Sequence, residues 1–475
     1  MNTFRLEHDL LGDREVPGDA WWGVHTLRAL ENYPITGTPL SSCPALVRAL
    51  ALVKSAAAHA NRDLGLIDAP RADVIIAACA EIADGALHDQ FVVDVVQGGA
   101  GTSTNMNANE VIANLALHKL GRPSGDYTTL HPIEHVNASQ STNDVYPTAI
   151  KLALSFMIED LLAAMARLRE SYERKADEFA DVLKMGRTQL QDAVPMTLGQ
   201  EFRTYAVMMS EDEARLSEAR ALIQEVNLGA TAIGTGINTH PEYARLACTH
   251  LARLSGLPIQ PAHDMIEATQ DTGAFVQLSG VLKRIACKVS KTCNDLRLLS
   301  SGPQAGFGEI NLPARAAGSS IMPGKVNPVI PEVVNQVAFE VIGNDVTVTM
   351  ASEAGQLQLN AFEPVIAWSL SKSLRHMRAA FDTLARHCID GITANRELLN
   401  LRVRGSAGLA TALNPYIGYE AATRIAREAL ATGQGVAELV LAQGLLGPSE
   451  LSEILKPEVL TRPHRPLRPI GAPSK

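Results

Sequence analysis

Two adjacent serines, the first of them Ser319, lie close to Lys325 in a loop that contains two glycines and a proline. A serine hydroxyl beside a fixed positive charge and a glycine-rich backbone could be activated as a base or nucleophile. A plain polar loop is the alternative. The loop, residues 318–327, resembles a phosphate-binding loop only superficially. Pro323 stands where that pattern needs glycine, and Val326 stands where it needs serine or threonine, so ATP binding is not expected.

Three further polar clusters lie at residues 101–107, 139–144 and 186–192. The first could cap a helix, or its hydroxyl and amide groups could surround a carboxylate. The second is predicted to cap a long helix beginning near Pro147, and such a helix end also attracts anions. The third follows that helix and precedes Pro195, which predicts a connection that carries several side-chain donors.

The segment from His131 to His135 fits the H-x-x-E-H pattern of inverted zinc peptidases. That pattern needs a helix with both histidines on one face and a third ligand. Pro132 and the residues that follow instead indicate a loop approaching a helix cap, so a metal peptidase is not expected.

Five long segments carry the spacing of apolar residues that is typical of helices. They span residues 147–183, 198–227, 272–300, 331–350 and 363–390. Strand signals are sparse by comparison. The pattern predicts a mainly α fold with a central bundle of five long helices. Any helix face that stays apolar must find another subunit, so we expect an oligomer, although a single monomeric bundle is the simpler alternative.

The chain has 475 residues and a net charge of −9, with 46% hydrophobic and 20% charged residues. This composition is that of an ordinary soluble globular protein and argues against a nucleic-acid or anionic-membrane surface. The six cysteines are scattered, so neither a disulfide framework nor a zinc ribbon is expected. No apolar run is long enough to cross a membrane, and the first residues lack a signal-peptide pattern. We expect a cytoplasmic protein with no membrane and no nucleic-acid partner.

The changes in pattern along the chain predict three segments. Residues 1–140 form an N-terminal mixed helical domain, residues 141–396 form the central helical bundle, and residues 397–475 form a small C-terminal helical domain. That last domain ends in a Pro/Arg-rich tail, which begins near Arg462.

Together, these clusters resemble the fumarase/aspartase superfamily, and the 318–327 loop matches its signature loop. The resemblance covers nearly the whole chain. It includes residues 9–12, 22–28, 232–238 and 413–419. It implies a three-domain, almost entirely helical subunit, whose central five-helix bundles assemble into a twenty-helix core in a homotetramer. It also implies that each active site gathers loops from three subunits.

The resemblance also assigns roles to individual residues. Ser319 would be the catalytic base that removes a proton beside a carboxylate, leaving an aci-carboxylate intermediate. The other residues would bind substrate. Those around the β-carboxylate are Thr102, Ser141, Thr142 and Ser320; those around the α-carboxylate are Thr188, Lys325 and Asn327; those facing the amino group are Asn143 and Gln189.

Two positions favour the ammonia-lyase branch of the superfamily over the hydratase branch. Fumarases usually carry histidine where Gln189 stands and serine where Thr142 stands. Expelling hydroxide needs an acid, and neutral Gln189 cannot supply a proton, whereas an ammonium group leaves as neutral ammonia. The resemblance therefore implies reversible anti elimination of ammonia from L-aspartate to give fumarate. Fumarate hydratase is the alternative, followed by a catalytically silent scaffold protein of the same fold.

The implied partners are the small molecules L-aspartate, fumarate and ammonia, together with further copies of the chain. The resemblance implies no required cofactor and no metal ligands. It leaves open whether a divalent cation such as Mg²⁺ activates the enzyme.

Overall fold

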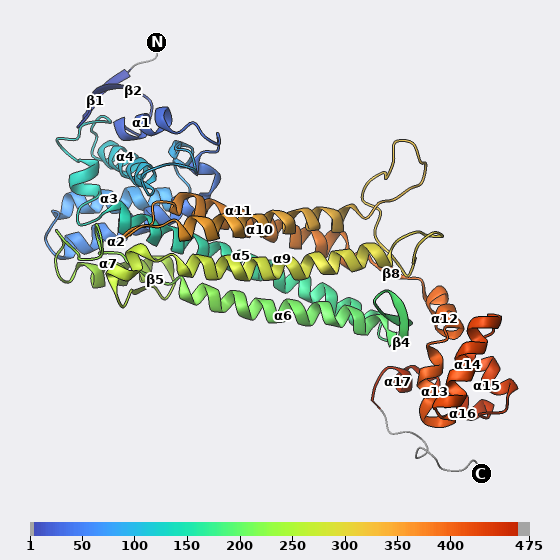
Figure 1. Cartoon of the computed structure of the whole chain (residues 1–475). Coiled ribbons are helices and arrows are strands. Elements are labelled where there is room, and N and C mark those ends of the chain that lie inside the picture. Colours follow the sequence, from blue (N-terminus) through green and yellow to red (C-terminus); the bar gives the residue numbers. More distant parts are fainter. Residues whose placement is uncertain (1–3, 464–475) are drawn as a thin grey trace. The chain divides into compact units, whose positions relative to one another are not determined.

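The structure is a computed structural model that describes residues 4–463, and these residues are mainly helical, as predicted (Figure 1). The chain forms two compact units that alternate along the sequence. The first unit consists of Met1–Ala163, Asp212–Cys287 and Val337–Arg378. The second consists of Ala164–Glu211, Lys288–Gln336 and Ala379–Lys475. The chain passes from one unit to the other only inside long helices.

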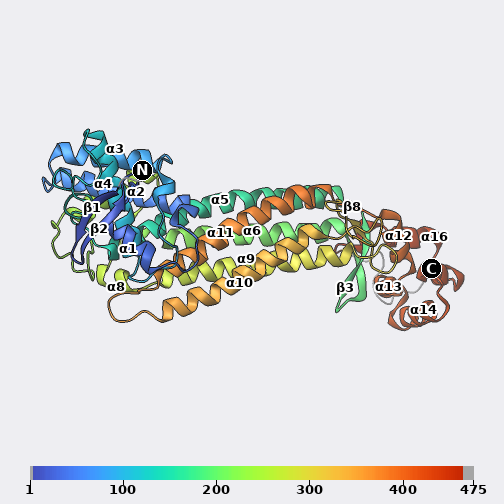
Figure 2. The same cartoon turned by 90° about the horizontal axis from the view of Figure 1, so that it is seen from above.

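Five long helices contribute residues to both units. They are α5 (Thr142–Glu178), α6 (Leu198–Leu222), α9 (Gly273–Leu299), α10 (Val329–Glu353) and α11 (Glu363–His387). Within each unit their segments lie side by side in two perpendicular views (Figures 1 and 2). The apolar residues that predicted α5 are fully buried at Leu154, Ile158, Leu161, Met165 and Leu168. The prediction of five long helices is therefore confirmed, with boundaries that differ by a few residues.

The rest of the first unit combines short helices with a hairpin. Its strands are β1 (Phe4–Asp9), β2 (Gly12–Pro17), β5 (Glu225–Val226) and β6 (Gln260–Pro261). Its helices are α1 (Val24–Asn32), α2 (Pro44–Asp63), α3 (Ala69–Ala83), α4 (Thr102–Lys119), α7 (Tyr243–Ser255) and α8 (Met265–Gln270). Helix α2 packs against α3 and α7, and α3 also packs against α4. The β1–β2 pair is antiparallel, whereas β5 and β6 are parallel.

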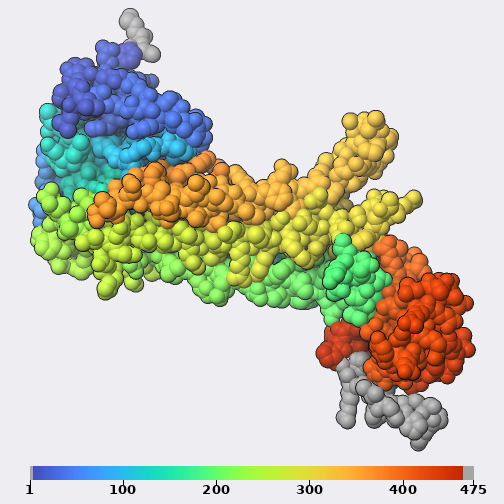
Figure 3. Space-filling view, viewed as in Figure 1, coloured from blue at the N-terminus to red at the C-terminus, as the bar shows by residue number. Residues whose placement is uncertain are grey.

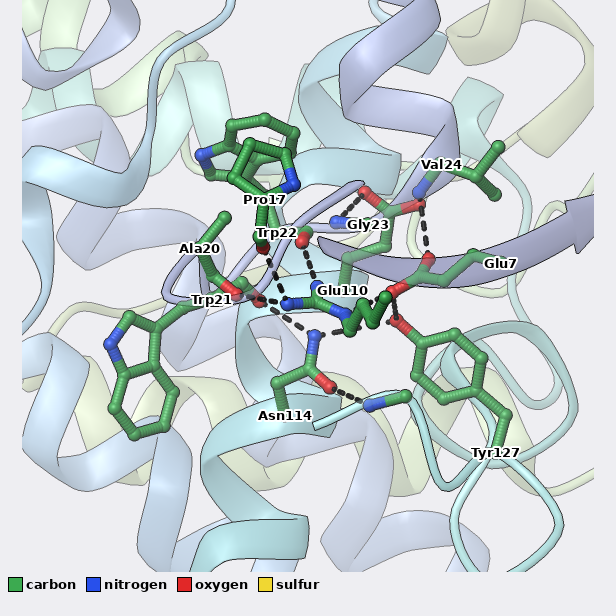
Figure 4. Close-up of polar contacts among 12 residues, drawn as sticks. Glu7, Pro17, Ala20, Trp21, Trp22, Gly23, Val24, Glu110, Asn114 and Tyr127 are labelled. Carbon is green, nitrogen blue, oxygen red and sulfur yellow. Dashed lines mark hydrogen bonds and ion pairs between the residues drawn. The ribbon is translucent and has the colours of Figure 1, made fainter. Parts of the chain in front are cut away.

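Two buried carboxylates hold the N-terminus of α1 (Figure 4). Glu110 on α4 accepts hydrogen bonds from the backbone N–H groups of Gly23 and His25, each at 2.8 Å. Glu7 on β1 accepts one from the backbone N–H of Val24 at 2.8 Å. Burial raises the pKa of Glu110 to about 7. The first N–H groups of a helix have no partner within it, so these carboxylates satisfy them and attach α1 to α4 and β1.

Helix α5 begins earlier than predicted, at Thr142 instead of near Pro147. Proline has no N–H, so Pro147 cannot donate to the carbonyl of Asn143 one turn before it. The Asn227 side chain replaces that donor, since its Nδ2 lies 3.0 Å from the Asn143 carbonyl oxygen. Proline is therefore tolerated inside the first two turns, and the polar residues before it belong to the helix.

The rest of the second unit contains two strand pairs and the C-terminal helices. The strands are β3 (Leu183–Thr188), β4 (Gln191–Thr197), β7 (Ile310–Asn311) and β8 (Thr393–Ala394), and both pairs are antiparallel. The helices are α12 (Arg396–Gly405), α13 (Leu409–Ile417), α14 (Tyr419–Thr432), α15 (Val436–Ala442), α16 (Pro448–Ile454) and α17 (Pro457–Leu460). An apolar cluster built from residues such as Leu413, Ile425 and Val440 holds α13–α16 together.

The cluster at residues 186–192 lies in the connection between α5 and α6, as predicted, and this connection is a β-hairpin. Strands β3 and β4 pair Thr188 with Gln191, which leaves a two-residue turn at Gln189 and Leu190. Both turn residues have positive φ, at 54° and 60°. Turns of this kind usually carry asparagine and glycine. Glutamine and leucine give no such signal, which is why the sequence did not predict the hairpin.

The segment between α9 and α10 carries the 318–327 loop and stands out from the surface of its unit (Figure 3). Most residues from 311 to 326 are exposed, including the apolar side chain of Ile321. A loop with this little burial is held by few packing contacts.

No helix among residues 4–463 is both long and apolar enough to cross a membrane. The expected division into segments 1–140, 141–396 and 397–475 stays a prediction. Apart from its first two residues, the Pro/Arg-rich tail lies outside the described residues.

Candidate active site

Thr102 is the first residue of α4 and follows a glycine that no other residue could replace. Gly101 has a φ of +87°, and a Cβ on it would lie 2.2 Å from the ring of Tyr146. The exposed Thr102 hydroxyl donates a hydrogen bond to the Gly99 carbonyl at 2.7 Å. The N-cap residue is Gly101, which has no side chain, and the Thr104 N–H is instead capped by Gln97 Oε1 at 3.0 Å, from outside the cluster. Of the two predictions for this cluster, the cap is therefore wrong. The turn presents the exposed Thr102 hydroxyl at a helix N-terminus, a setting that suits an anion.

Ser141, Thr142 and Asn143 lie at the start of α5. The Ser141 hydroxyl accepts a hydrogen bond from the backbone N–H of Asn143 at 3.3 Å, so the predicted capping role of this cluster is confirmed. The Asn143 side chain donates to the Ala232 carbonyl at 2.7 Å. This hydrogen bond fixes the orientation of the Asn143 side-chain amide, which was predicted to face the amino group of a substrate.

The buried carboxylate of Asp144 holds this helix start in place. It accepts hydrogen bonds from the backbone N–H groups of Ser141, Gly229 and Thr231 at 3.0–3.1 Å. Burial raises the pKa of Asp144 to about 6, against the opposing effect of these three donors. Asp144 thereby joins the first turn of α5 to the segment around residue 230.

A buried polar network connects Thr142 to α4. Asn105 Nδ2 lies 3.2 Å from Thr142 Oγ1 and 3.1 Å from Asn137 Oδ1. The same Asn137 oxygen accepts a hydrogen bond from Lys54 Nζ at 2.8 Å. Lys54 is fully buried, and burial lowers its pKa to about 7, although the charge of Asp144 acts in the opposite direction. The network joins the two polar clusters of the first unit around a lysine that titrates near neutrality.

In the second unit, Thr188 ends β3 and Gln189 occupies the hairpin turn, and both side chains are exposed. Arg187, just before them, is held by an ion pair with the buried Glu309 and lies over the ring of Phe307, 4.3 Å from its centroid. Thr188 and Gln189 therefore face solvent, while the contacts of Arg187 fix the backbone immediately before them.

Within the 318–327 loop, backbone donors point at the predicted base. Ser319 Oγ accepts hydrogen bonds from the N–H groups of Ile321 at 3.2 Å and Met322 at 2.9 Å. A Cβ on Gly318 would lie 2.0 Å from the Lys325 carbonyl oxygen, so the loop closes on itself only with glycine there. Two N–H dipoles directed at one oxygen stabilise negative charge on it.

A cavity of about 720 Å³ lies beside this loop in the second unit. Its lining includes Lys325, Asn327, Arg297, Ser300 and Asn311. A cavity lined by two cationic side chains and several neutral donors suits a carboxylate ligand.

The ten predicted site residues divide between the two units. Those in the first unit are Thr102, Ser141, Thr142 and Asn143; those in the second are Thr188, Gln189, Ser319, Ser320, Lys325 and Asn327. Their assigned roles as base and substrate ligands stay predictions.

Residues 132–136 form a short π-helical turn where a loop was expected. His131 Nδ1 caps that turn by accepting from Ile133 N–H at 3.0 Å, and His135 Nδ1 accepts from the His131 N–H at 2.8 Å. The Nδ1 atom of each histidine therefore accepts a backbone hydrogen bond. Across residues 4–463, no group of three histidine, cysteine, aspartate or glutamate side chains is arranged to hold a metal ion.

Sequence reasoning missed the buried groups behind the site. Lys54 interrupts an otherwise apolar helical run, and that interruption was the available signal. Asn137 and Glu309 gave no signal, because their partners lie far away in the sequence.

The chain matches two family profiles, one described as lyase over residues 12–343 and one described as fumarase C C-terminus over residues 409–462. It is 59% identical over 462 residues to an aspartate ammonia-lyase of Pseudomonas canavaninivorans, covering 97% of this chain and 98% of that protein. An aspartate ammonia-lyase of Escherichia coli (strain K12) is 55% identical over 463 residues, with 97% of each chain covered.

Two solved structures share the fold over nearly the whole chain. A fumarate lyase:delta crystallin from Brucella melitensis bound to cobalt has a TM-score of 0.95 and 56% identity, covering 97% of this chain and 100% of that one. A class II fumarase from Schistosoma mansoni has a TM-score of 0.92 and 33% identity, covering 98% and 100%.

The lowered pKa of Lys54 predicts a pH-dependent contribution to stability. Between the native pKa of about 7 and the ordinary value of 10.5, the unfolded chain binds more protons than the native one, so this residue makes the native state more stable as pH rises. From pH 7 to pH 9 the unfolding free energy should rise by about 2 kcal/mol relative to Lys54→Met. Urea unfolding of both proteins at the two pH values measures this. The surface variant Lys119→Met is the control, and an equal pH dependence of parent and Lys54→Met would contradict the assignment.

Proposed function

Because the chain belongs to the fumarase/aspartase superfamily, and within it to the aspartate ammonia-lyases, we propose that it catalyses the reversible anti elimination of ammonia from L-aspartate to give fumarate. The full-length match to enzymes of that name carries this conclusion. The glutamine at position 189 supports it, since a neutral amide cannot protonate a departing hydroxide.

Ser319 is the base that removes the proton beside the β-carboxylate of the substrate. A free serine hydroxyl is a weak base, so its oxygen needs stabilised negative charge. The hydrogen bonds that Ser319 Oγ accepts from Ile321 and Met322 N–H groups supply that stabilisation. As the proton leaves, charge builds on the carboxylate and gives an aci-carboxylate dianion, which positioned donors must bind more strongly than the ground state.

The donors around the β-carboxylate are Thr102, Ser141, Thr142 and Ser320. The fixed start of α5 supports this assignment. The exposed Thr102 hydroxyl would turn from the Gly99 carbonyl to donate to substrate. The residues that hold the α-carboxylate are Thr188, Lys325 and Asn327, and the cationic lining of the cavity beside the 318–327 loop supports their role. Asn143 and Gln189 face the amino group. The loop closes over substrate, and its glycines permit the backbone change.

The chain works as a homotetramer in which three copies contribute loops to each active site. An apolar stripe on α10 supports an oligomer. Phe339, Val346 and Met350 are 57–67% exposed, and with the exposed Gly343 they follow the spacing of one helix face. Such a face calls for a partner of the same kind, and a second copy of α10 supplies it.

No cofactor is needed for this chemistry, because side chains and backbone N–H groups supply both the base and the anion-binding donors. We place the enzyme in the cytoplasm. All six cysteines are free thiols and five of them are buried, which is compatible with a reducing compartment.

The choice of leaving group is tested by following the ultraviolet absorbance of fumarate. The purified protein should form fumarate from L-aspartate and should form little or none from L-malate. A signal from L-malate alone would assign the protein to the hydratases. Absence of a signal from either would make it a catalytically silent scaffold.

Ser319→Ala should lower kcat for L-aspartate by more than tenfold, equivalent to more than about 1.4 kcal/mol of transition-state stabilisation. Substrate binding should persist, because the carboxylate ligands remain. Ser320→Ala is the matched variant and should lower kcat much less than Ser319→Ala does, since it removes only one of four donors to the aci-carboxylate and leaves the base in place. Steady-state kinetics separate the two effects. A Ser319→Ala protein that keeps more than a tenth of kcat would rule out Ser319 as the base.

Phe339→Glu should convert the tetramer into smaller species, because it places a charge in the middle of the apolar stripe on α10. Size-exclusion chromatography with light scattering gives the mass. Leu430→Glu is the control, since Leu430 is 77% exposed on α14 and lies outside the stripe. If Phe339→Glu keeps the parent mass, α10 does not form the interface.

A further inference from the structure

A buried carboxylate that has no assigned role in substrate binding lies among three cations in the second unit. Glu309 is 1% exposed, and its Oε2 lies 2.9 Å from Lys184 Nζ. Its other oxygen is paired with Arg187 and lies 3.5 Å from Arg402 Nη1. Lys184 is also buried and pairs with Glu201 at 2.6 Å. Burial would raise the pKa of Glu309, but Arg187 and Lys184 outweigh that effect and lower it.

Two of the three cations around Glu309 belong to the hairpin that carries two of the proposed substrate ligands. Lys184 and Arg187 both lie on β3, and Arg187 immediately precedes Thr188 and Gln189. Arg187 also packs over the ring of Phe307, so its guanidinium is held from two directions. The position of Arg187 therefore determines where the exposed turn begins.

Glu309 itself stands at the root of the segment that carries the 318–327 loop. Its backbone N–H donates to the Leu299 carbonyl at the end of α9 at 2.8 Å. Its carbonyl accepts from the backbone N–H of Asn395 at 2.9 Å, and the next residue begins β7, which pairs with β8. The backbone of Glu309 is thus fixed on one side of the network, while its side chain reaches the hairpin on the other.

Buried ion pairs of this kind fix the relative positions of the segments they join more reliably than they raise the free energy of unfolding. The cost of removing two charges from water offsets most of their attraction, and apolar replacements are often neutral or stabilising. Charge-assisted hydrogen bonds from a guanidinium are directional, however, and hold two backbones at a fixed spacing.

We propose that Glu309 is a positioning residue, which sets the β3–β4 hairpin and the root of the 318–327 loop in a fixed arrangement through Arg187 and Lys184. The inference rests on the proposed function, since both segments matter only if Thr188, Gln189 and Ser319 meet substrate. The proposed role of Glu309 does not depend on which subunits contribute the other residues of the site, because Glu309, Lys184 and Arg187 belong to one chain.

Glu309→Gln tests the proposal. KM for L-aspartate should rise about tenfold or more while kcat falls by less than threefold, because binding groups are displaced and Ser319 keeps its own N–H donors. Glu201→Gln is the matched control, since Glu201 pairs with the same Lys184, and its KM should stay within twofold of the parent. Arg187→Gln should reproduce the effect, and the double variant should be no worse than the worse single variant, because the two residues act as one pair.

Hydrogen exchange gives a readout that does not depend on activity. In Glu309→Gln, the amides of residues 184–192 and 310–327 should both exchange faster, whereas the amides of α14 should not change. Arg187→Lys keeps the positive charge but loses the planar set of guanidinium N–H donors. It should give the same exchange pattern, and it replaces Glu309→Gln if that variant fails to fold. An unchanged KM in Glu309→Gln, an equal rise in Glu201→Gln or unchanged exchange would overturn the proposal. If the parent protein forms no fumarate from L-aspartate, the proposed function is overturned instead. Hydrogen exchange would then still test the positioning role of Glu309.

Discussion

A carboxylate that is removed from water must be met by donors, and Asp144 is met by three backbone N–H groups from two segments far apart in the sequence. That requirement fixes the first turn of α5, where Ser141, Thr142 and Asn143 lie. Glu309 acts in the same way in the second unit, with lysine and arginine side chains as its partners. In both units, a buried charged group fixes the backbone that carries residues assigned to substrate.

The 318–327 loop is held by local hydrogen bonds and not by a buried charge. Its contacts are local: two N–H groups on Ser319 Oγ and a bond from Asn327 Nδ2 to the Gly318 carbonyl at 2.7 Å. Most of its side chains are exposed, so its internal shape is set by the chain itself while little packing holds it to the rest of its unit. The base proposed at Ser319 would thus combine electrostatic preorganisation by its own N–H donors with a loop that is free to close over substrate.

The helices and the polar clusters could be predicted from the sequence because both are local patterns. Apolar spacing gave the five long helices, and the residue types gave the clusters around Ser319 and Ser141. The β3–β4 hairpin was not predicted because glutamine and leucine, at positions 189 and 190, are not typical of a turn with two positive φ angles. Lys54 and Glu309 were missed for another reason: their roles are contacts between distant segments, and a single sequence carries no pairing information.

The placement of Gln189 and Gly318 explains why the superfamily is easier to identify than the substrate. Gln189 is exposed in a two-residue turn, so its side chain can change without repacking any neighbour. A Cβ at Gly318 would instead collide with the Lys325 carbonyl oxygen, so the loop that carries the proposed base tolerates little variation. The segment proposed to remove the proton is therefore fixed by steric constraint, whereas the residue proposed to face the leaving group is free to differ. A glutamine in that role would permit the departure of ammonia and withhold the proton that hydroxide would need.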